Sequence, residues 1–171
     1  MKLFIVNGAP GAGKTTFENM VQDVFLEEYP DSKYCYIFST IDFIKDIAYK
    51  CGWDGTKTGK NRKFLSDLKD LLTEWDDVPY QHILTQIEYI PSYLKEKDII
   101  VFIDSREPQE IERFKRELDA KALLIRRDEN QTEITNHADR NVENCKYDYI
   151  IENNGSLVDL YARAREFLKE I

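Results

Sequence analysis

The residues best suited to chemistry form a phosphate-binding loop near the start of the chain. Residues 8–15 read Gly-Ala-Pro-Gly-Ala-Gly-Lys-Thr, which fits the pattern G-x-x-x-x-G-K-[ST]. Glycines allow such a turn to aim successive backbone N–H groups at one anion. Lys14 would neutralise the β- and γ-phosphates of a nucleotide, and the Thr15 hydroxyl would ligate Mg²⁺. The residues predicted to contact the nucleotide here are Gly8, Ala9, Pro10, Gly11, Ala12, Gly13, Lys14, Thr15 and Thr16.

The elements on either side of the loop fit this interpretation. A short apolar run, Leu3–Val6, precedes the loop and predicts a buried strand. A helical pattern over residues 14–29 follows it, with apolar residues recurring on one face. Strand, glycine-rich turn and helix together are the context that a phosphate loop needs, because the helix N-terminus also attracts anions.

Alternating strand and helix patterns along the chain predict an α/β fold with a parallel sheet covered on both faces. The predicted strands are Leu3–Asn7, Tyr34–Phe38, Ile99–Asp104, Ala122–Arg126 and Tyr147–Glu152. The predicted helices cover residues 14–29, 42–50, 61–75, 80–96, 107–118 and 156–170. Ligands bind such sheets at the carboxyl ends of the strands, so residues that directly follow the strands are candidates for the site.

Asp104 and Arg106 follow the third strand. A carboxylate there can hold the magnesium shell, and a guanidinium is suited to bidentate phosphate recognition. Two other interpretations remain open: Asp104 caps the next turn, or Arg106 pairs on the surface with Glu107 or Glu110.

Asp42 and Lys45 follow the second strand, where they would line a pocket for the phosphoryl acceptor unless Asp42 merely caps a helix. Arg62 opens a helix after the loop Trp53–Lys60, which we expect to be mobile. A cation at a helix N-terminus opposes the helix dipole, so its position favours a nearby anion.

Three further arginines predict a lid. Arg126 and Arg127 follow the fourth strand, and Arg140 lies in a long polar stretch after it. Arginines placed in this way can close over a phosphoryl group in transfer and exclude water. A solvated run of charge is the alternative for Arg127 and Arg140.

The bulk properties narrow the possible partners. The 171 residues carry a net charge of −8, which argues against a nucleic-acid surface. No apolar stretch is long enough for a signal peptide or a membrane span. The three widely spaced cysteines suggest reduced thiols, so we expect a cytoplasmic protein without membrane partners. Because amphipathic helices can pack internally or against a second subunit, both a monomer and a homodimer remain open.

Four segments together resemble the P-loop nucleoside and nucleotide monophosphate kinases, most closely the phage-type deoxynucleoside monophosphate kinases and the animal phosphomevalonate kinases. The segments are the loop 8–15, the run 39–45 (Ser-Thr-Ile-Asp-Phe-Ile-Lys), the helix start 60–65, and residues 136–139 with 147–155. The D-G-[FY]-P-R motif of adenylate kinases is absent, and Asp104-Ser105-Arg106-Glu107-Pro108 stands in its place.

The resemblance implies one three-layer α/β/α domain over residues 1–171, with five strands in the order 2-3-1-4-5. It implies an acceptor-binding segment at about 40–97, a lid at about 127–144, and an approach of Asn153 and its turn to the adenine. It also implies transfer of the γ-phosphoryl of ATP, with Mg²⁺, to a small phosphorylated acceptor. The residues assigned to catalysis are Lys14, Arg62, Asp104, Arg106 and Arg126, and those facing the acceptor are Asp42, Lys45, Arg62 and Arg106.

Three functional hypotheses follow. The first is a kinase of a nucleoside or deoxynucleoside monophosphate. The second keeps the fold and takes another phosphorylated metabolite. The third is an ATP-binding regulatory protein without phosphotransfer; a GTPase is disfavoured because no N-K-x-D motif occurs.

Overall fold

Five parallel strands form the centre of the molecule. The computed structural model describes residues 1–28, 33–94, 98–128 and 145–171. The strands are β1 (Lys2–Asn7), β2 (Lys33–Ser39), β3 (Asp98–Asp104), β4 (Lys121–Arg126) and β5 (Tyr149–Glu152). They pair in the order β2-β3-β1-β4-β5, which confirms the predicted α/β/α fold and strand order.

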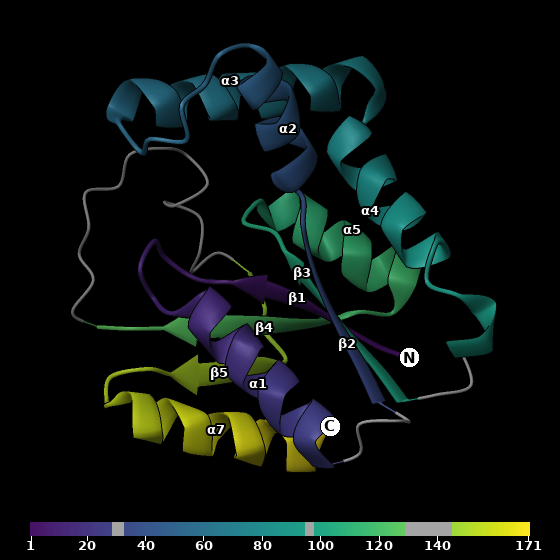
Figure 1. Ribbon diagram of the computed structural model, residues 1–171, viewed down its shortest axis with the longest axis vertical. Helices are drawn as coiled ribbons and strands as arrows, with labels where there is room; N and C mark the ends of the chain where they lie inside the picture. The colour runs from purple at the N-terminus through teal and green to yellow at the C-terminus, as the bar shows by residue number, and fades with distance from the viewer. Residues whose placement is uncertain (29–32, 95–97, 129–144) are drawn as a thin grey trace.

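Alternate residues of each strand contribute to two separate hydrophobic cores, because successive side chains point to opposite faces of a sheet. Phe4 and Val6 pack on one face with the helices α1 (Lys14–Glu28) and α7 (Leu157–Glu170). Ile5 packs on the other face with α4 (Val78–Glu88) and α5 (Pro108–Leu118). Figure 1 shows α1 and α7 side by side on the near face of the sheet.

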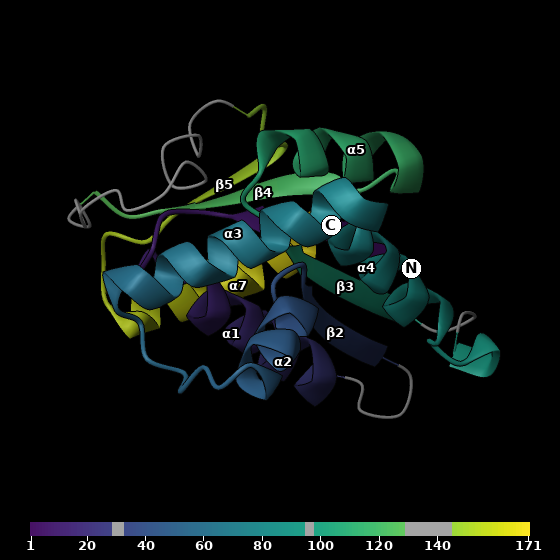
Figure 2. The same cartoon turned by 90° about the horizontal axis from the view of Figure 1, so that it is seen from above.

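Two more helices lie past the carboxyl ends of β2 and β3, at the top of Figure 1. α2 (Asp42–Lys50) continues from β2, and α3 (Gly59–Asp76) follows it. α3 touches α2 and α4, and none of its residues is fully buried. The view from above in Figure 2 shows α3 as a long helix on the outside of the molecule.

The structure corrects two of the predicted elements. The helix predicted over 80–96 is wrong in its second half: α4 ends at Glu88, and a short 3₁₀ turn follows at Ser92–Leu94. Pro91 causes the break because it has no N–H and disfavours the helical conformation of the residue before it. Residues 95–97 lie outside the described chain.

The strand predicted from Tyr147 begins two residues later, at Tyr149. Tyr147 instead accepts a hydrogen bond from the Asn7 side chain, and the Asp148 carboxylate accepts the Ala122 N–H. The Asp148 N–H also donates to the Ala122 carbonyl at 2.8 Å, so the chain is already held beside β4 before regular strand pairing begins at Tyr149. Helix α3 begins at Gly59 and ends at Asp76, slightly wider than the predicted 61–75.

The turn between α3 and α4 is fastened to α5 by one arginine. Arg113 bonds to Asp77 and to Glu117, and its guanidinium lies 3.6 Å from the centre of the Tyr80 ring. The Tyr80 hydroxyl donates to Glu117 at 2.7 Å, and burial with this carboxylate raises the pKa of Tyr80 to about 12. This cluster ties the helices past the strand ends to the helical layer of the sheet.

We predict that Arg113→Ala lowers the free energy of unfolding by about 1–2 kcal/mol, since the cation–π contact and two partly exposed ion pairs are lost. The exposed Arg116 on the same helix is the matched control, and Arg116→Ala should change stability by less than about 0.5 kcal/mol. Urea unfolding followed by circular dichroism measures both variants. Equal effects of the two substitutions would contradict the role given to Arg113.

Candidate functional site

The phosphate loop packs directly against β4 and the turn after β5, and two of its glycines leave no room for a side chain. A Cβ on Gly8, whose φ is +151°, would lie 2.4 Å from the Ile125 carbonyl oxygen of β4. A Cβ on Gly13, with φ +96°, would lie 2.4 Å from the Asn153 side chain. The glycines are therefore needed both for their backbone conformation and for close approach.

Two asparagine side chains hold the loop by hydrogen bonds to its backbone. The Asn7 side chain accepts the Gly8 N–H at 2.7 Å and donates to the Tyr147 hydroxyl at 2.7 Å. The Asn153 side chain donates to the Ala12 carbonyl at 2.8 Å. Sequence reasoning placed Asn153 near the nucleotide but missed Asn7, which is fully buried. A polar residue that ends an apolar strand directly before Gly8 was the available signal.

Lys14 lies over the loop at the start of α1. Its ammonium group donates to the Gly8 carbonyl at 2.8 Å, so the charge is held beside the loop backbone. Thr15 and Thr16 follow it in the first turn of α1 and are exposed. Because the first N–H groups of a helix have no partner within the helix, this end of α1 offers donors and positive potential to an anion.

Asp104 lies level with the end of β1, next to the loop. The strand register pairs Val6 with Asp104 and Ser39 with Asp104, and the Thr40 N–H donates to the Asp104 carbonyl at 3.1 Å. These bonds hold the ends of β2, β3 and β1 at one height. The carboxyl end of β3 therefore meets the phosphate loop, as the sequence predicted.

The Asp104 carboxyl is the centre of a charged cluster. Its Oδ1 is buried and has no hydrogen-bond partner among the described residues. Burial raises the pKa of Asp104, and the nearby charges of Lys14, Arg106 and Lys45 oppose that rise, while Asp42 adds to it. Residues from the loop, from the end of β3 and from the start of α2 thus lie close enough for their charges to act on one carboxyl.

Asp42 and Lys45 form an ion pair on α2, 2.9 Å from Oδ1 to Nζ. Asp42 is the first residue of the helix, but Ile41 is the N-cap position and no side chain caps it. The capping alternative for Asp42 is therefore wrong. Both side chains are partly exposed, so a ligand can reach them, and their role toward an acceptor stays a prediction.

Arg62 lies in the first turn of α3, where Thr58 caps the helix by accepting the Asn61 N–H at 3.2 Å. Arg62 is half-buried and shares a helix face with Lys69, two turns later, which pairs with Glu110 of α5 at 2.9 Å. The preceding loop, expected to be mobile, has its own hydrogen bonds: Asp54 accepts from Thr56 and from Asn61.

Of the arginines of the predicted lid, Arg126 and Arg127 lie in different surroundings. Arg126 ends β4 and bonds to Glu152 across the sheet at 3.1 Å. Arg127 lines a hollow beside the phosphate loop. Arg140, with most of the segment 127–144, lies outside the described residues, so its role stays a prediction.

That hollow has a volume of about 370 Å³, within the range of small-molecule sites. Its walls are the loop glycines, the turn after β5 and the start of α7, including Gly13, Asn153 and Leu157. Leu157 is 67% exposed, and so is the apolar Val158 beside it at 77%. The hollow thus combines the apolar side chains of Leu157 and Leu160 with Arg127 next to the phosphate loop.

The residues present also fit a magnesium ion. Mg²⁺ takes oxygen ligands and keeps several waters. The exposed Thr15 hydroxyl and the unpartnered Asp104 carboxylate oxygen are oxygen donors at this edge of the sheet. Within the described residues, no group of three or more His, Cys, Asp or Glu side chains gathers as an all-protein metal site. A metal here would therefore be shared with a ligand.

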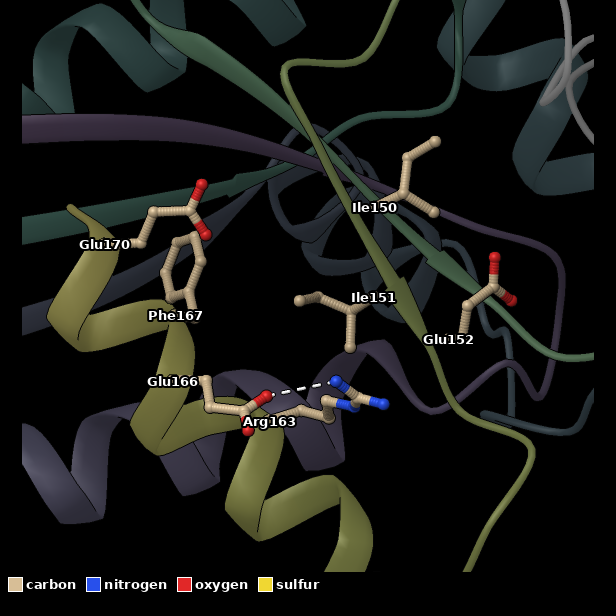
Figure 3. Close-up of a pocket in the computed structure, with 7 residues that line it drawn as sticks. All are labelled: Ile150, Ile151, Glu152, Arg163, Glu166, Phe167 and Glu170. Atoms are coloured by element: carbon tan, nitrogen blue, oxygen red, sulfur yellow. Dashed lines mark hydrogen bonds and ion pairs between the residues drawn. The ribbon is translucent and has the colours of Figure 1, made fainter.

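A second hollow, of about 210 Å³, lies between β5 and α7, away from the phosphate loop (Figure 3). Glu152, Glu166 and Glu170 line it, and its Arg163 already bonds to Glu166 at 3.1 Å. The excess of carboxylates would repel phosphate. This hollow is therefore poorly suited to a phosphate group.

Sequence reasoning also missed Glu18, a fully buried carboxyl on α1. Neither of its oxygens has a hydrogen-bond partner in the described chain. Burial raises the pKa of Glu18 to about 8, with a contribution from Asp104 and opposition from Lys14. Its spacing from Val21 and Phe25 put it on the apolar face of the predicted helix, and this was the signal that could have found it.

We predict that Glu18 makes stability fall as pH rises. Its pKa is about 8 in the folded state and 4.5 in the ordinary case, so the folded state binds more protons between these values. Glu18→Gln removes this dependence. Relative to the wild type, its free energy of unfolding should rise between pH 5 and pH 8 by on the order of a few kcal/mol, and its melting temperature should rise with it. Calorimetry at several pH values measures this gain.

The exposed Glu27 on the same helix provides the control, since Glu27→Gln should keep the wild-type pH dependence. A constant difference in melting temperature between Glu18→Gln and the wild type at all pH values would show that Glu18 does not bind the extra proton.

Comparison with solved structures shows the fold. The chain is similar to thymidylate kinase from Ehrlichia chaffeensis, with a TM-score of 0.50, 11% identity and 98% of each chain covered. Shikimate kinase from Acinetobacter baumannii matches with a TM-score of 0.47, 12% identity, and 98% of this chain and 90% of that chain covered. No protein-family model matches the chain, and no curated protein does. At this identity, the first match demonstrates a shared architecture and leaves the activity to be argued from the site.

Proposed function

We propose that the protein is an ATP-dependent phosphotransferase that moves the γ-phosphoryl group of ATP to a small phosphorylated acceptor, most readily a nucleoside or deoxynucleoside monophosphate. The observation that carries the proposal is the gathering of charges around the Asp104 carboxyl at the end of β3. Lys14 of the phosphate loop, Lys45 of α2 and Arg106 after β3 all lie close enough to act on it.

The donor would bind at the loop and in the adjoining hollow. The loop and the start of α1 would hold the β- and γ-phosphates through backbone N–H groups, and Lys14 would move from the Gly8 carbonyl to the phosphates. The base would enter the hollow lined by Arg127 and Leu157. This arrangement would hold both ends of ATP and would direct its γ-phosphate toward Asp104.

The acceptor would bind on the other side of Asp104, under α2 and α3. Lys45 and Arg106 are the cations that face this carboxyl from the acceptor side, and Arg62 stands at the start of α3. A phosphate group is already an anion near neutral pH, so it can attack without losing a proton to the protein. Cations at these positions therefore suit a phosphorylated acceptor better than a neutral alcohol.

Catalysis would consist mainly of positioning and charge neutralisation, as phosphoryl transfer requires. Thr15 and Asp104 would hold Mg²⁺, which when bound neutralises charge on the transferred group. Lys14 and Arg106 would attract the oxygens of donor and acceptor and bring the two phosphates together. The fold shared with a thymidylate kinase is compatible with this chemistry but does not choose the acceptor.

An assay of ADP release tests the proposal. Purified protein, ATP and Mg²⁺ would be combined with each common ribo- and deoxynucleoside monophosphate, with phosphomevalonate tested in parallel. We expect one or a few nucleoside monophosphates to stimulate ADP formation. ATP binding without stimulation by any of these acceptors would contradict the proposed function and favour a regulatory role.

We predict that Lys14→Ala lowers kcat at least about a hundredfold, because the charge that neutralises the transferring phosphoryl group is removed. Lys169, near the end of α7 and far along the chain from the loop, supplies the control, and Lys169→Ala should keep the wild-type rate. Steady-state ADP release measures both. An unchanged kcat in Lys14→Ala would exclude the loop from catalysis.

We also predict that Arg106→Ala raises the KM for the acceptor about tenfold or more and leaves the KM for ATP within about threefold, since one charge-assisted phosphate contact is lost. The exposed Arg116→Ala is the control for loss of an arginine. If the KM for ATP rises as much as that for the acceptor, Arg106 belongs to the donor side.

A further inference from the structure

Helix α3 has an apolar stripe that faces away from the rest of the protein. Phe64, Leu68, Leu71 and Trp75 follow each other at spacings of four, three and four residues, which places them along one side of a helix. Phe64 is 37% exposed, Leu71 61% and Trp75 73%, and Leu68 is half-buried. Three large apolar side chains on one helix are thus left in contact with water.

One intramolecular contact of α3 marks its inner side. Lys69 bonds to Glu110 of α5, and only 13% of its side chain is exposed. At about 100° per residue, Leu71 lies roughly 160° around the helix from Lys69. The exposed part of the stripe therefore faces away from the contact with α5, and Figure 2 shows α3 on the outer surface.

The charges along α3 are arranged in the order opposite to the one that an isolated helix prefers. Residues 57–63 contain Lys57, Lys60, Arg62 and Lys63 and no acid, whereas residues 70–77 contain Asp70, Glu74, Asp76 and Asp77 and no base. Acidic side chains are favourable at a helix N-terminus and basic ones at its C-terminus, so this arrangement is unfavourable within one chain.

We propose that the stripe on α3 is a dimer interface, in which a second copy of this chain packs its own α3 antiparallel across a two-fold axis. In this arrangement Phe64 faces Trp75 of the second copy, and Leu68 faces Leu71. The axis passes between Leu68 and Leu71, so the contact is made twice with the same residues, as a two-fold dimer requires.

The antiparallel arrangement also resolves the charge distribution. The basic start of each helix lies beside the acidic end of the other, and each helix dipole is opposed by its neighbour. Lys63 already pairs with Asp67, and Asp77 with Arg113, so the attraction acts between the two ends as a whole. A parallel dimer would place like charges together, which is why the second copy must run in the opposite direction.

Sedimentation velocity over about a hundredfold range of concentration tests the association. We expect a monomer–dimer equilibrium, weakened by salt, because one helix pair buries less than the roughly 1,600 Å² of a standard interface. Leu71→Asp should give a monomer at every concentration with an unchanged melting temperature. Ile150→Asp, at an exposed isoleucine on β5, should keep the dimer. A wild-type protein that stays monomeric throughout would overturn the proposal.

Cysteine cross-linking tests the orientation. In a Cys51→Ser background, which removes the exposed native cysteine, Phe64→Cys and Trp75→Cys would be prepared separately and mixed under oxidising conditions. We expect disulfide-linked dimers in the mixture and few in either variant alone, because disulfides need Cα atoms within about 7 Å. Efficient cross-linking of Trp75→Cys with itself would overturn the antiparallel arrangement.

Discussion

The close contact between the phosphate loop and β4 constrains the whole site. Gly8 approaches the Ile125 carbonyl so closely that no Cβ fits, and Gly13 approaches Asn153 in the same way. The loop thus has one position relative to the sheet, and the start of α1 follows from it. Since β1, β3 and β2 end at the same height, Asp104 and the residues after β2 are brought to that position. The geometry of the site depends on this close packing of the loop more than on any single charged residue.

A second consequence of this packing is that several ionisable groups lie together where water is largely excluded. Glu18 and Asp104 are both withdrawn from water beside Lys14, and burial raises the pKa of each carboxyl. Buried groups without hydrogen-bond partners cost stability, and proteins commonly keep such groups at functional sites. The cost is concentrated where the chain would need charge to meet phosphate, which fits a site shaped for binding rather than for stability.

Much of this arrangement could be predicted from the sequence. The alternation of apolar strands with helices predicts the α/β fold with a parallel sheet, whereas the strand order came from the resemblance to P-loop kinases. The sequence predicted the ends of helices less well. Pro91 disfavours a helical conformation at the residue before it, and α4 ends at Glu88, well before the predicted end at residue 96. Tyr147 has the apolar character of a strand, but its contact with Asn7 comes from a residue far away in the sequence.

Long-range contacts explain the other limits. Asn7 and Glu18 matter because of what the folded chain places beside them, and a single sequence does not contain those distances. Lys45 and Arg106 were predicted near strand ends because each follows a strand closely in the sequence, and the charges of both act on Asp104. The pairing of Arg126 with Glu152 depends on the neighbouring strand, which the sequence alone does not give. The exposed stripe on α3 has the same helical periodicity as a buried one, so the sequence left open whether it packs within the chain.

In the function we propose, ATP binds in the phosphate loop with its base against the turn after β5. A crystal structure grown with Mg²⁺ and a non-hydrolysable ATP analogue tests this placement most directly. We expect electron density for the triphosphate along Gly8–Thr15, a metal ion near Thr15 and Asp104, and the base in the hollow lined by Arg127 and Leu157. Nucleotide density elsewhere, for example in the hollow between β5 and α7, would contradict it.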